Sequence, residues 1–191
     1  DCGQEVLFMD ALECIMTRRT CRAFKPDMPE KEKLDAVLEA ARVAPSGMSR
    51  FTRHFAVITD KDWLARMNER VRLLAGDASV SSNLERNGAK GYSCNYHSPV
   101  FVVVSADPSY NTSRDDCSCA LENMFLAAHA VGLGSCWINQ LGGDNCEKLR
   151  DLLTEAGVPA GHRVYGCCAL GYAAGEPAPR KPRVEKIDYL G

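Results

Sequence analysis

An unbroken run of apolar residues, Val-Phe-Val-Val-Val at 100–104, constrains the fold of this chain more than any other feature. A strand with one face in water alternates apolar and polar side chains, so this run predicts a strand that is buried on both faces. Both faces of any sheet built on it must then be covered by other layers of the chain. With 191 residues, the chain is long enough to supply those layers within one domain.

Apolar residues at helical spacing predict the covering helices. Pro45 requires the second of them to end near Ala44, and the segment after Ser113 is nearly apolar throughout, which is typical of a central helix. The predicted helices span residues 10–16, 30–44, 61–75, 113–131 and 144–157, and the predicted strands span 54–58, 99–104, 136–140, 162–170 and 184–190. Because strands and helices mix without strict alternation, the sequence predicts an α+β fold with helices around a small sheet.

The first predicted helix has a clear start. Asp10 can cap it, with Glu13 three residues later in a capping-box pattern. Leu12, Ile15 and Met16 then follow helical spacing, so this short helix is expected to carry an apolar stripe.

Two stretches lie outside these elements. Residues 76–95 are rich in Ser, Asn and Gly with little periodicity, which predicts a mobile excursion, either a substrate lid or a disordered loop. Residues 1–8 lack the charged and apolar regions of a secretion signal. They are expected to be disordered or foreign to the native chain, with Met9 as an alternative start. No linker or repeat divides the rest, so residues 1–191 are predicted to form a single domain.

Ten cysteines are many for this length, yet none stands in the Cys-x-x-Cys spacing of zinc or iron–sulfur sites. Cys117 and Cys119 are two apart in a helical pattern and do not share a face. Cys167 and Cys168 are neighbours in a strand and point to opposite sides. We therefore expect free thiols that act as small hydrophobic side chains in a reducing compartment, which predicts a cytoplasmic protein with no metal site.

The net charge of -2 gives no overall attraction to nucleic acid or to an anionic membrane. No apolar run approaches the roughly 20 residues that span a bilayer. Positive charge is instead local, in the segment 17–24 with its three arginines and in a second cluster at 180–183. Arginine suits a phosphate group or a planar ring. A basic stretch is more often a solvated helix end, so this pattern alone favours that interpretation over a binding site.

Two glycine-containing loops complete the inventory of motifs. Residues 45–50, Pro-Ser-Gly-Met-Ser-Arg, form a loop by composition. Gly132 and Gly134 follow the central helix and end it. A dinucleotide-binding fold needs its Gly-x-Gly-x-x-Gly motif after a strand, at the start of a helix. That fold is therefore excluded.

Four separated motifs together resemble the FMN-dependent nitroreductase family. The family patterns are Arg-Arg-Ser/Thr-x-Arg-x-Phe, Ala-Pro-Ser-Gly-x-Asn-x-Gln-Pro-Trp-x-Phe, Gly-Leu-Gly-x-x-Trp-Ile, and Gly-Tyr with a later Lys-x-Arg. The matching stretches here are Arg18–Phe24, Ala44–Phe55, Gly132–Ile138 and Gly171–Tyr172 with Lys181–Arg183. Each is weak alone, whereas four in the family's order cover nearly the whole chain from Met9 onward.

The resemblance implies a nitroreductase-like three-layer α/β/α sandwich with a small, mostly antiparallel sheet. It implies an obligate homodimer that exchanges C-terminal arms and binds two FMN molecules at the subunit interface. It also implies an oxidoreductase that uses NADH or NADPH to reduce nitroaromatic, quinone or related small-molecule acceptors, by ping-pong hydride transfer through flavin N5. Because the cofactor carries the hydride, no catalytic side chain is expected.

Matching the motifs position by position implies a set of cofactor-binding residues. The first motif and the C-terminal Lys-x-Arg would hold the phosphate and ribityl chain, with Arg22 near the pyrimidine edge of the ring. The second motif would come from the other subunit, and the backbone of residues 137–140 would line the ring near N5 and O4. The implied residues are Arg18, Arg19, Thr20, Arg22, Pro45, Ser46, Gly47, Ser49, Trp137, Ile138, Asn139, Gln140, Lys181 and Arg183.

The second motif departs from the family pattern. Ser49 replaces its Asn, and residues 51–53, Phe-Thr-Arg, replace Gln-Pro-Trp, which would place an added cation beside the flavin and alter substrate preference. Asn95 is a candidate for an Asn that often touches the ring in this family. Three alternatives stay open: a flavin-binding or sensing module with little turnover, a dehalogenating or flavin-consuming relative, and a cysteine-based redox or metal protein.

Overall fold

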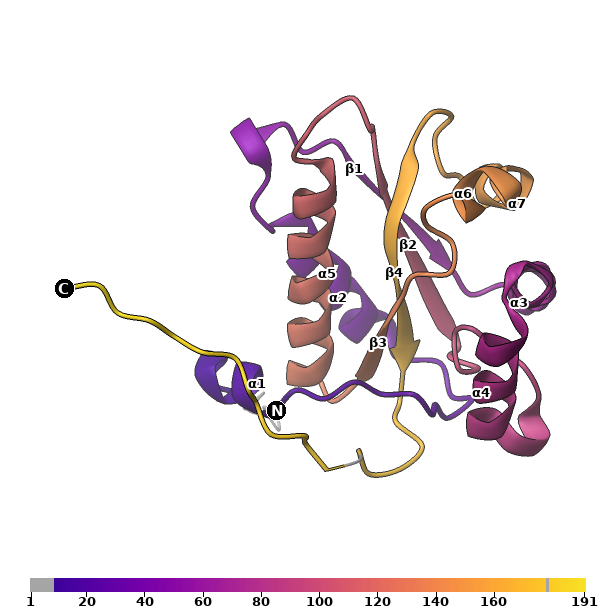
Figure 1. Ribbon diagram of the computed structural model, residues 1–191, viewed down its shortest axis with the longest axis horizontal. Helices are drawn as coiled ribbons and strands as arrows, with labels where there is room; N and C mark the ends of the chain where they lie inside the picture. Colours follow the sequence, from indigo (N-terminus) through magenta and orange to yellow (C-terminus); the bar gives the residue numbers. More distant parts are fainter. Residues whose placement is uncertain (1–8, 178) are drawn as a thin grey trace, which may run out of the picture.

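The computed structural model of the chain describes residues 9–177 and 179–191, so the expectation for residues 1–8 lies outside the described part. A four-stranded sheet in the order β1-β2-β4-β3 forms its centre, and every strand pair is antiparallel (Figure 1). The strands are β1 (Arg53–Ile58), β2 (Val100–Ala106), β3 (Gly134–Ile138) and β4 (Arg163–Gly171). Every residue of β2 is buried, as its apolar run predicts.

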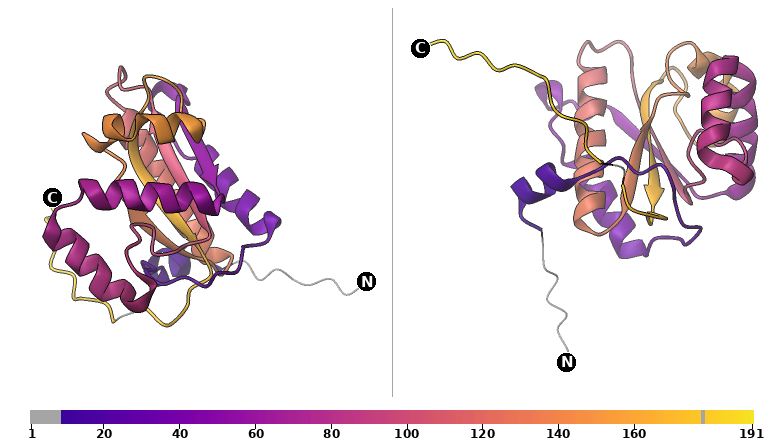
Figure 2. Two further views of the ribbon diagram at one scale, coloured as in Figure 1. Left: turned by 90° about the vertical axis from the view of Figure 1, so that its right-hand side faces the viewer. Right: turned by 60° about the horizontal axis from the view of Figure 1, so that its bottom comes forward.

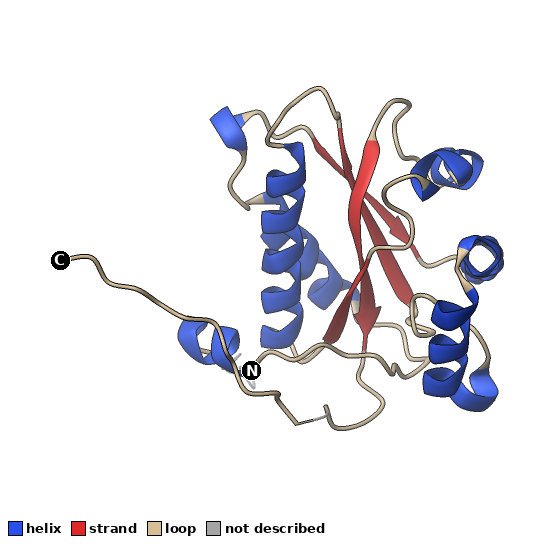
Figure 3. Cartoon of the chain, viewed as in Figure 1, coloured by secondary structure: helices blue, strands red, loops and turns tan. Residues whose placement is uncertain are grey.

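One face of the sheet is covered by two helices, α2 (Lys31–Arg42) and α5 (Ser113–Ala130) (Figure 3). The even-numbered valines of β2 pack into this layer with Leu121 and Met124 of α5. At Gly166 of β4 the helix is so close that a Cβ atom would lie 2.6 Å from Leu121 Cδ1. The helix α5 is therefore the central helix that its apolar composition predicts.

The other face is covered by four helices, α3 (Lys61–Leu74), α4 (Asp77–Asn87), α6 (Asn145–Lys148) and α7 (Arg150–Glu155) (Figure 2). Phe101 and Val103 of β2 pack into this layer with Trp63 of α3. The two apolar clusters on opposite sides of the sheet confirm the three-layer α/β/α sandwich. The single helix expected over 144–157 is instead two short ones, because the backbone at Leu149 (φ -112°) leaves the helical conformation.

The described cysteines behave as the sequence predicts. All nine are unpaired. Cys117 is buried while Cys119 is exposed, and Cys167 and Cys168 belong to the apolar clusters on opposite faces of the sheet. Burial raises the pKa of the Cys94 thiol to about 12, so this side chain is a neutral hydrophobic group at physiological pH.

Residues 76–95 differ from the mobile excursion that the sequence predicts. They form α4 and a short 3-10 turn, η2 (Gly88–Lys90), and then enter the protein interior. The Asn83 side chain both donates to and accepts from the Ser93 backbone, at 2.9 Å each. Side-chain hydrogen bonds, and not a stripe of apolar residues, hold this segment in place. The spacing of apolar residues therefore did not predict its structure.

Both ends of the described chain leave apolar side chains uncovered. The helix α1 (Ala11–Thr17) is capped by Asp10 as predicted, yet Leu12, Ile15 and Met16 are 71%, 53% and 67% exposed. The C-terminal arm extends away from the body of the chain (Figure 1, Figure 2). The strand expected over 184–190 does not form, and the sheet of the described residues consists of the four strands β1, β2, β4 and β3.

Among the described helices, none has the length and apolar character needed to cross a membrane.

Candidate functional site

The first arginine motif is fixed along the ends of β3 and β4. Thr20 bridges Ser135 of β3 in parallel, and the Cys21 amide donates to the Ser135 carbonyl oxygen at 2.8 Å. Phe24 is buried in the core and bridges Ala173, directly after β4. Because β3 and β4 are neighbours in the sheet, these two bridges place residues 18–24 beside the chain that leaves β4.

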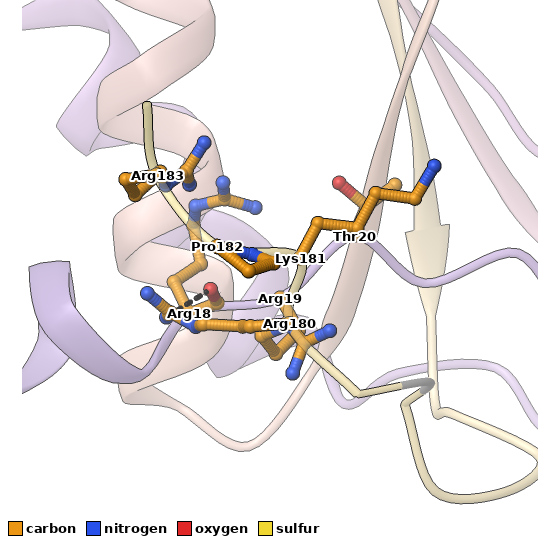
Figure 4. Close-up of a pocket in the computed structure, with 7 residues that line it drawn as sticks. All are labelled: Arg18, Arg19, Thr20, Arg180, Lys181, Pro182 and Arg183. Atoms are coloured by element: carbon orange, nitrogen blue, oxygen red, sulfur yellow. Dashed lines mark hydrogen bonds between the residues drawn. The ribbon is translucent and has the colours of Figure 1, made fainter. Parts of the chain in front are cut away.

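The C-terminal arm then meets the first motif (Figure 4). The Arg180 guanidinium donates to the Arg18 carbonyl oxygen at 3.0 Å, although the two residues are 162 positions apart. Together the two segments enclose a hollow of about 170 Å³. Its lining consists of Arg18, Arg19, Thr20, Arg180, Lys181, Pro182 and Arg183.

The lining of this cationic hollow is strongly positive. Five of its seven lining residues are cationic and none is acidic. Arg18 reaches Glu122 only at 3.8 Å, and Lys181 makes no ion pair or hydrogen bond to any described residue. Several cationic donors around one small space fit a phosphate group, whose oxygens accept charge-assisted hydrogen bonds. Matching the family motifs did not select Arg180 as a binding residue, although it belongs to the same basic cluster as Lys181 and Arg183.

A second pair of cations lies near Cys136 of β3. Burial raises the pKa of Cys136 to about 11, while Arg22, Arg86 and the more weakly acting Arg18 oppose the rise. Arg86, near the end of α4, donates to the Tyr96 hydroxyl at 3.1 Å and lies over the Tyr96 ring. The sequence singled out Arg22 but not Arg86, because the fold of α4 was not foreseen.

Residues 137–140 lie at the end of β3, and their side chains point in different directions. Ile138 is buried in the core, so only its backbone is available to a ligand. The Trp137 indole N–H donates to the Asn139 side-chain oxygen, and both side chains line a second hollow of about 430 Å³. The other residues that line it are Arg114, Ser118, Gly142, Gly143, Val164 and Tyr165. This hollow faces α5 and shares no residue with the cationic hollow.

The loop of the second motif lies at the other end of α5 from the cationic hollow (Figure 1). Its short turn η1 (Gly47–Ser49) is bound to the first turn of α5, where the Asp116 carboxylate accepts from the Gly47 amide at 2.9 Å. A single chain therefore does not bring Pro45, Ser46, Gly47 and Ser49 to the hollow. Arg53 does not extend from this loop as an added cation either, because its guanidinium donates to the carbonyl oxygens of Ala44 and Pro45.

Asn95 is not available to a cofactor. Its side chain is 1% exposed. The Oδ1 atom accepts from Asn68 and Ser93, and the Nδ2 atom donates to Ser98. Because its donors and acceptors are already used inside the protein, the expectation that Asn95 touches a ring is wrong.

Comparison with known proteins settles the family. The model of the nitroreductase family matches residues 15–172. This chain belongs to the nitroreductase family. The resemblance inferred from the four motifs is thereby confirmed for the family and the fold.

Several nitroreductases are similar over nearly their whole length. A nitroreductase with bound FMN from Bacteroides fragilis is 40% identical and has a TM-score of 0.83, with 96% of this chain and 100% of that one covered. One from Desulfitobacterium hafniense, also with bound FMN, is 30% identical with a TM-score of 0.85 and the same coverage. A putative NADH dehydrogenase/NAD(P)H nitroreductase from Archaeoglobus fulgidus is 31% identical over 172 residues, which is 87% of each chain.

Proposed function

We propose that this protein is an FMN-dependent oxidoreductase that uses NADH or NADPH to reduce a small aromatic or quinone-like acceptor. The observation that carries the proposal is the cationic hollow, where two segments 162 positions apart meet and supply five cationic residues to one small space. Nitroreductase relatives with bound FMN, at 40% and 30% identity, support FMN as the anion that this hollow receives.

The residues of this chain would divide the binding of FMN among them. Arg18, Arg19 and Thr20 would hold the phosphate and ribityl chain together with Lys181 and Arg183, by charge-assisted hydrogen bonds. When bound, FMN supplies the redox chemistry by taking a hydride from NAD(P)H and passing electrons to the acceptor. A cation near the pyrimidine edge, which Arg22 would provide, favours negative charge on the ring and so makes its reduction easier.

We further propose that the active species is a homodimer. The exposed stripe of α1 and the apolar residues of the C-terminal arm, with Ile187 76% and Tyr189 91% exposed, are surfaces that a second copy would cover. A second copy would also explain the separation of the two family motifs. The loop of Pro45, Ser46, Gly47 and Ser49 would then wall the flavin bound by its partner's cationic hollow, while the partner's backbone at residues 137–140 lines the ring.

The test is the colour of the purified protein and its response to nicotinamide. We expect flavin absorbance in the protein as purified or after addition of FMN, bleaching by NADH or NADPH without oxygen, and recovery when an acceptor is added. A panel of quinones, nitroaromatics and halogenated aromatics then identifies the acceptor class. Release of halide from the last group would identify a dehalogenating enzyme.

Two other outcomes contradict the proposal in different ways. Bound FMN that neither NADH nor NADPH bleaches would indicate a flavin-binding module with little turnover. A protein that takes up no FMN would remove the flavin assignment altogether.

A further inference from the structure

The loop of the second motif is held in an unfavourable backbone conformation. Met48, Ser49 and Phe51 all have positive φ angles, of 56°, 52° and 50°. Residues with a Cβ atom avoid this left-handed region, and they keep it only where surrounding contacts impose it. Gly47 adds a steric constraint, because a Cβ atom there would lie 2.7 Å from the Thr112 side chain. The loop therefore depends on specific anchors.

Asp116 of α5 is the first anchor. Asp116 is 5% exposed, and its carboxylate accepts from the Ser46 hydroxyl at 2.7 Å and from the Gly47 amide at 2.9 Å. The Ser46 oxygen in turn accepts from the Phe51 amide at 3.1 Å. These hydrogen bonds connect both ends of the left-handed segment to one buried carboxylate on the central helix.

Arg53 of β1 is the second anchor. Its guanidinium donates to the carbonyl oxygens of Ala44 at 2.8 Å, Pro45 at 3.0 Å and Asp116 at 3.2 Å. The planar fork of arginine spreads five N–H donors over three nitrogens, so it can reach carbonyl groups that lie apart, whereas the donors of lysine all share one nitrogen. Arg53 occupies the position of the Trp in the family motif, so this chain anchors the loop by hydrogen bonds where the family pattern has a ring.

We propose that Asp116 and Arg53 are positioning residues that shape residues 45–51 into a wall for the flavin bound mainly by the partner subunit. This inference rests on the proposed function, because it takes FMN and the homodimer from there. Neither residue needs to touch the cofactor, since both act through the backbone that they hold. The loss of either anchor would release the left-handed segment and open one side of the flavin site.

The first experiment compares Asp116→Asn with Asp115→Asn, its exposed neighbour on α5. The two donors contact different oxygens of Asp116, and Asp116→Asn replaces one of these oxygens with an NH2 group that cannot accept. We expect the dissociation constant for FMN to rise about tenfold in Asp116→Asn and to stay within about twofold in Asp115→Asn. Arg53→Lys should weaken FMN similarly, with the exposed Arg163→Lys as its control. Thermal unfolding of the flavin-free variants shows whether the fold is intact. The visible circular dichroism of bound FMN shows whether residues 45–51 still pack against the flavin.

The second experiment tests whether the anchors act across the subunit interface. In a heterodimer of one Asp116→Asn chain and one Arg183→Ala chain, one flavin site carries both defects and the other carries neither. We expect half of the sites to bind FMN with wild-type affinity, although both parent homodimers bind it weakly.

Three results would overturn the inference or its basis. Unchanged FMN affinity and unchanged visible spectra in both Asp116→Asn and Arg53→Lys would refute the role of the anchors. Two weakened sites in the heterodimer would show that the loop acts on its own chain's site. Wild-type protein that takes up no FMN would instead refute the proposed function.

Discussion

At the scale of single residues, the cationic hollow depends on side chains from an arm without regular secondary structure. Lys181 and Arg183 are exposed, and they face Arg18 and Arg19 with no acidic residue in the lining. Like charges held together repel one another, so their convergence favours the binding of an anion that neutralises them. This makes the arm the natural place to test the phosphate site.

Arg183→Ala should weaken FMN binding by roughly 2 kcal/mol, or about thirtyfold, because it removes one charge-assisted contact. Riboflavin lacks the phosphate, so its affinity should not change. Flavin fluorescence titration measures both, with Lys186→Ala on the same arm as the control. An equal loss for FMN and riboflavin would show that Arg183 does not face the phosphate.

Two partly buried histidines predict how the stability of the fold depends on pH. The His162 ring lies edge-on to the His54 ring and forms a hydrogen bond with the Ser105 hydroxyl. Burial lowers the pKa of both histidines. Because the unfolded chain then binds protons more readily than the folded one, stability should fall as the pH drops below the ordinary histidine pKa of about 6.5. Chemical denaturation at a series of pH values measures this slope. His162→Gln should flatten it, and an unchanged slope would exclude His162 as its source.

At the scale of elements, the contact between residues 20–21 and β3 connects the fold to the site. Gly134 faces Cys21, and a Cβ atom on Gly134 would lie 2.7 Å from Cys21 Cβ and 2.8 Å from its Sγ atom. The strand can therefore carry the first motif only where residue 134 has no side chain.

Gly134→Ala should cost about 1–3 kcal/mol of stability through overpacking, and it should also weaken FMN by displacing Thr20. The double variant Gly134→Ala/Cys21→Gly removes the colliding side chain and should recover part of both losses. Thermal unfolding and FMN titration test this pair of outcomes. Full stability of Gly134→Ala alone would show that the contact yields without cost.

Elements also show where sequence patterns succeed and fail. The apolar run of β2 was predictable because burial on both faces removes polar residues from the pattern, and the stripe of α5 was predictable because its apolar residues recur at helical spacing. The helix α4 and residues 93–98 were not, since they are held by Asn83, Asn95 and other buried polar side chains. Such hydrogen bonds connect residues without periodic spacing, so no pattern of spacing reveals them.

At the scale of the whole molecule, a single chain leaves apolar side chains of α1 and of the C-terminal arm exposed to water. Val184 and Leu190 of the arm, like Leu12 of α1, are far more exposed than the apolar residues of the core. Uncovered apolar side chains on adjacent segments are typical of a surface that another chain covers. The dissociation of the proposed dimer is therefore the quantity to measure.

Removing residues 184–191 should weaken the homodimer by at least about tenfold while leaving Lys181 and Arg183 in place. Sedimentation equilibrium of the truncated and full-length proteins measures the difference. A matched variant, Lys186→Gln, keeps the apolar side chains and should dimerise normally. An unchanged dimer in the truncated protein would show that the arm does not cross to the partner.

The sequence by itself determined the covered sheet, the central helix, the separation of the cysteines and, through four motifs, the nitroreductase family. These features follow from local composition, which dictates what must be buried and which motifs are present. Only the tertiary structure decided that Arg18 and Arg180 meet, that Asn95 is used up inside the protein, and that Arg53 turns inward to hold a loop. Such pairings join residues far apart in the chain, and a linear pattern contains no distance between them.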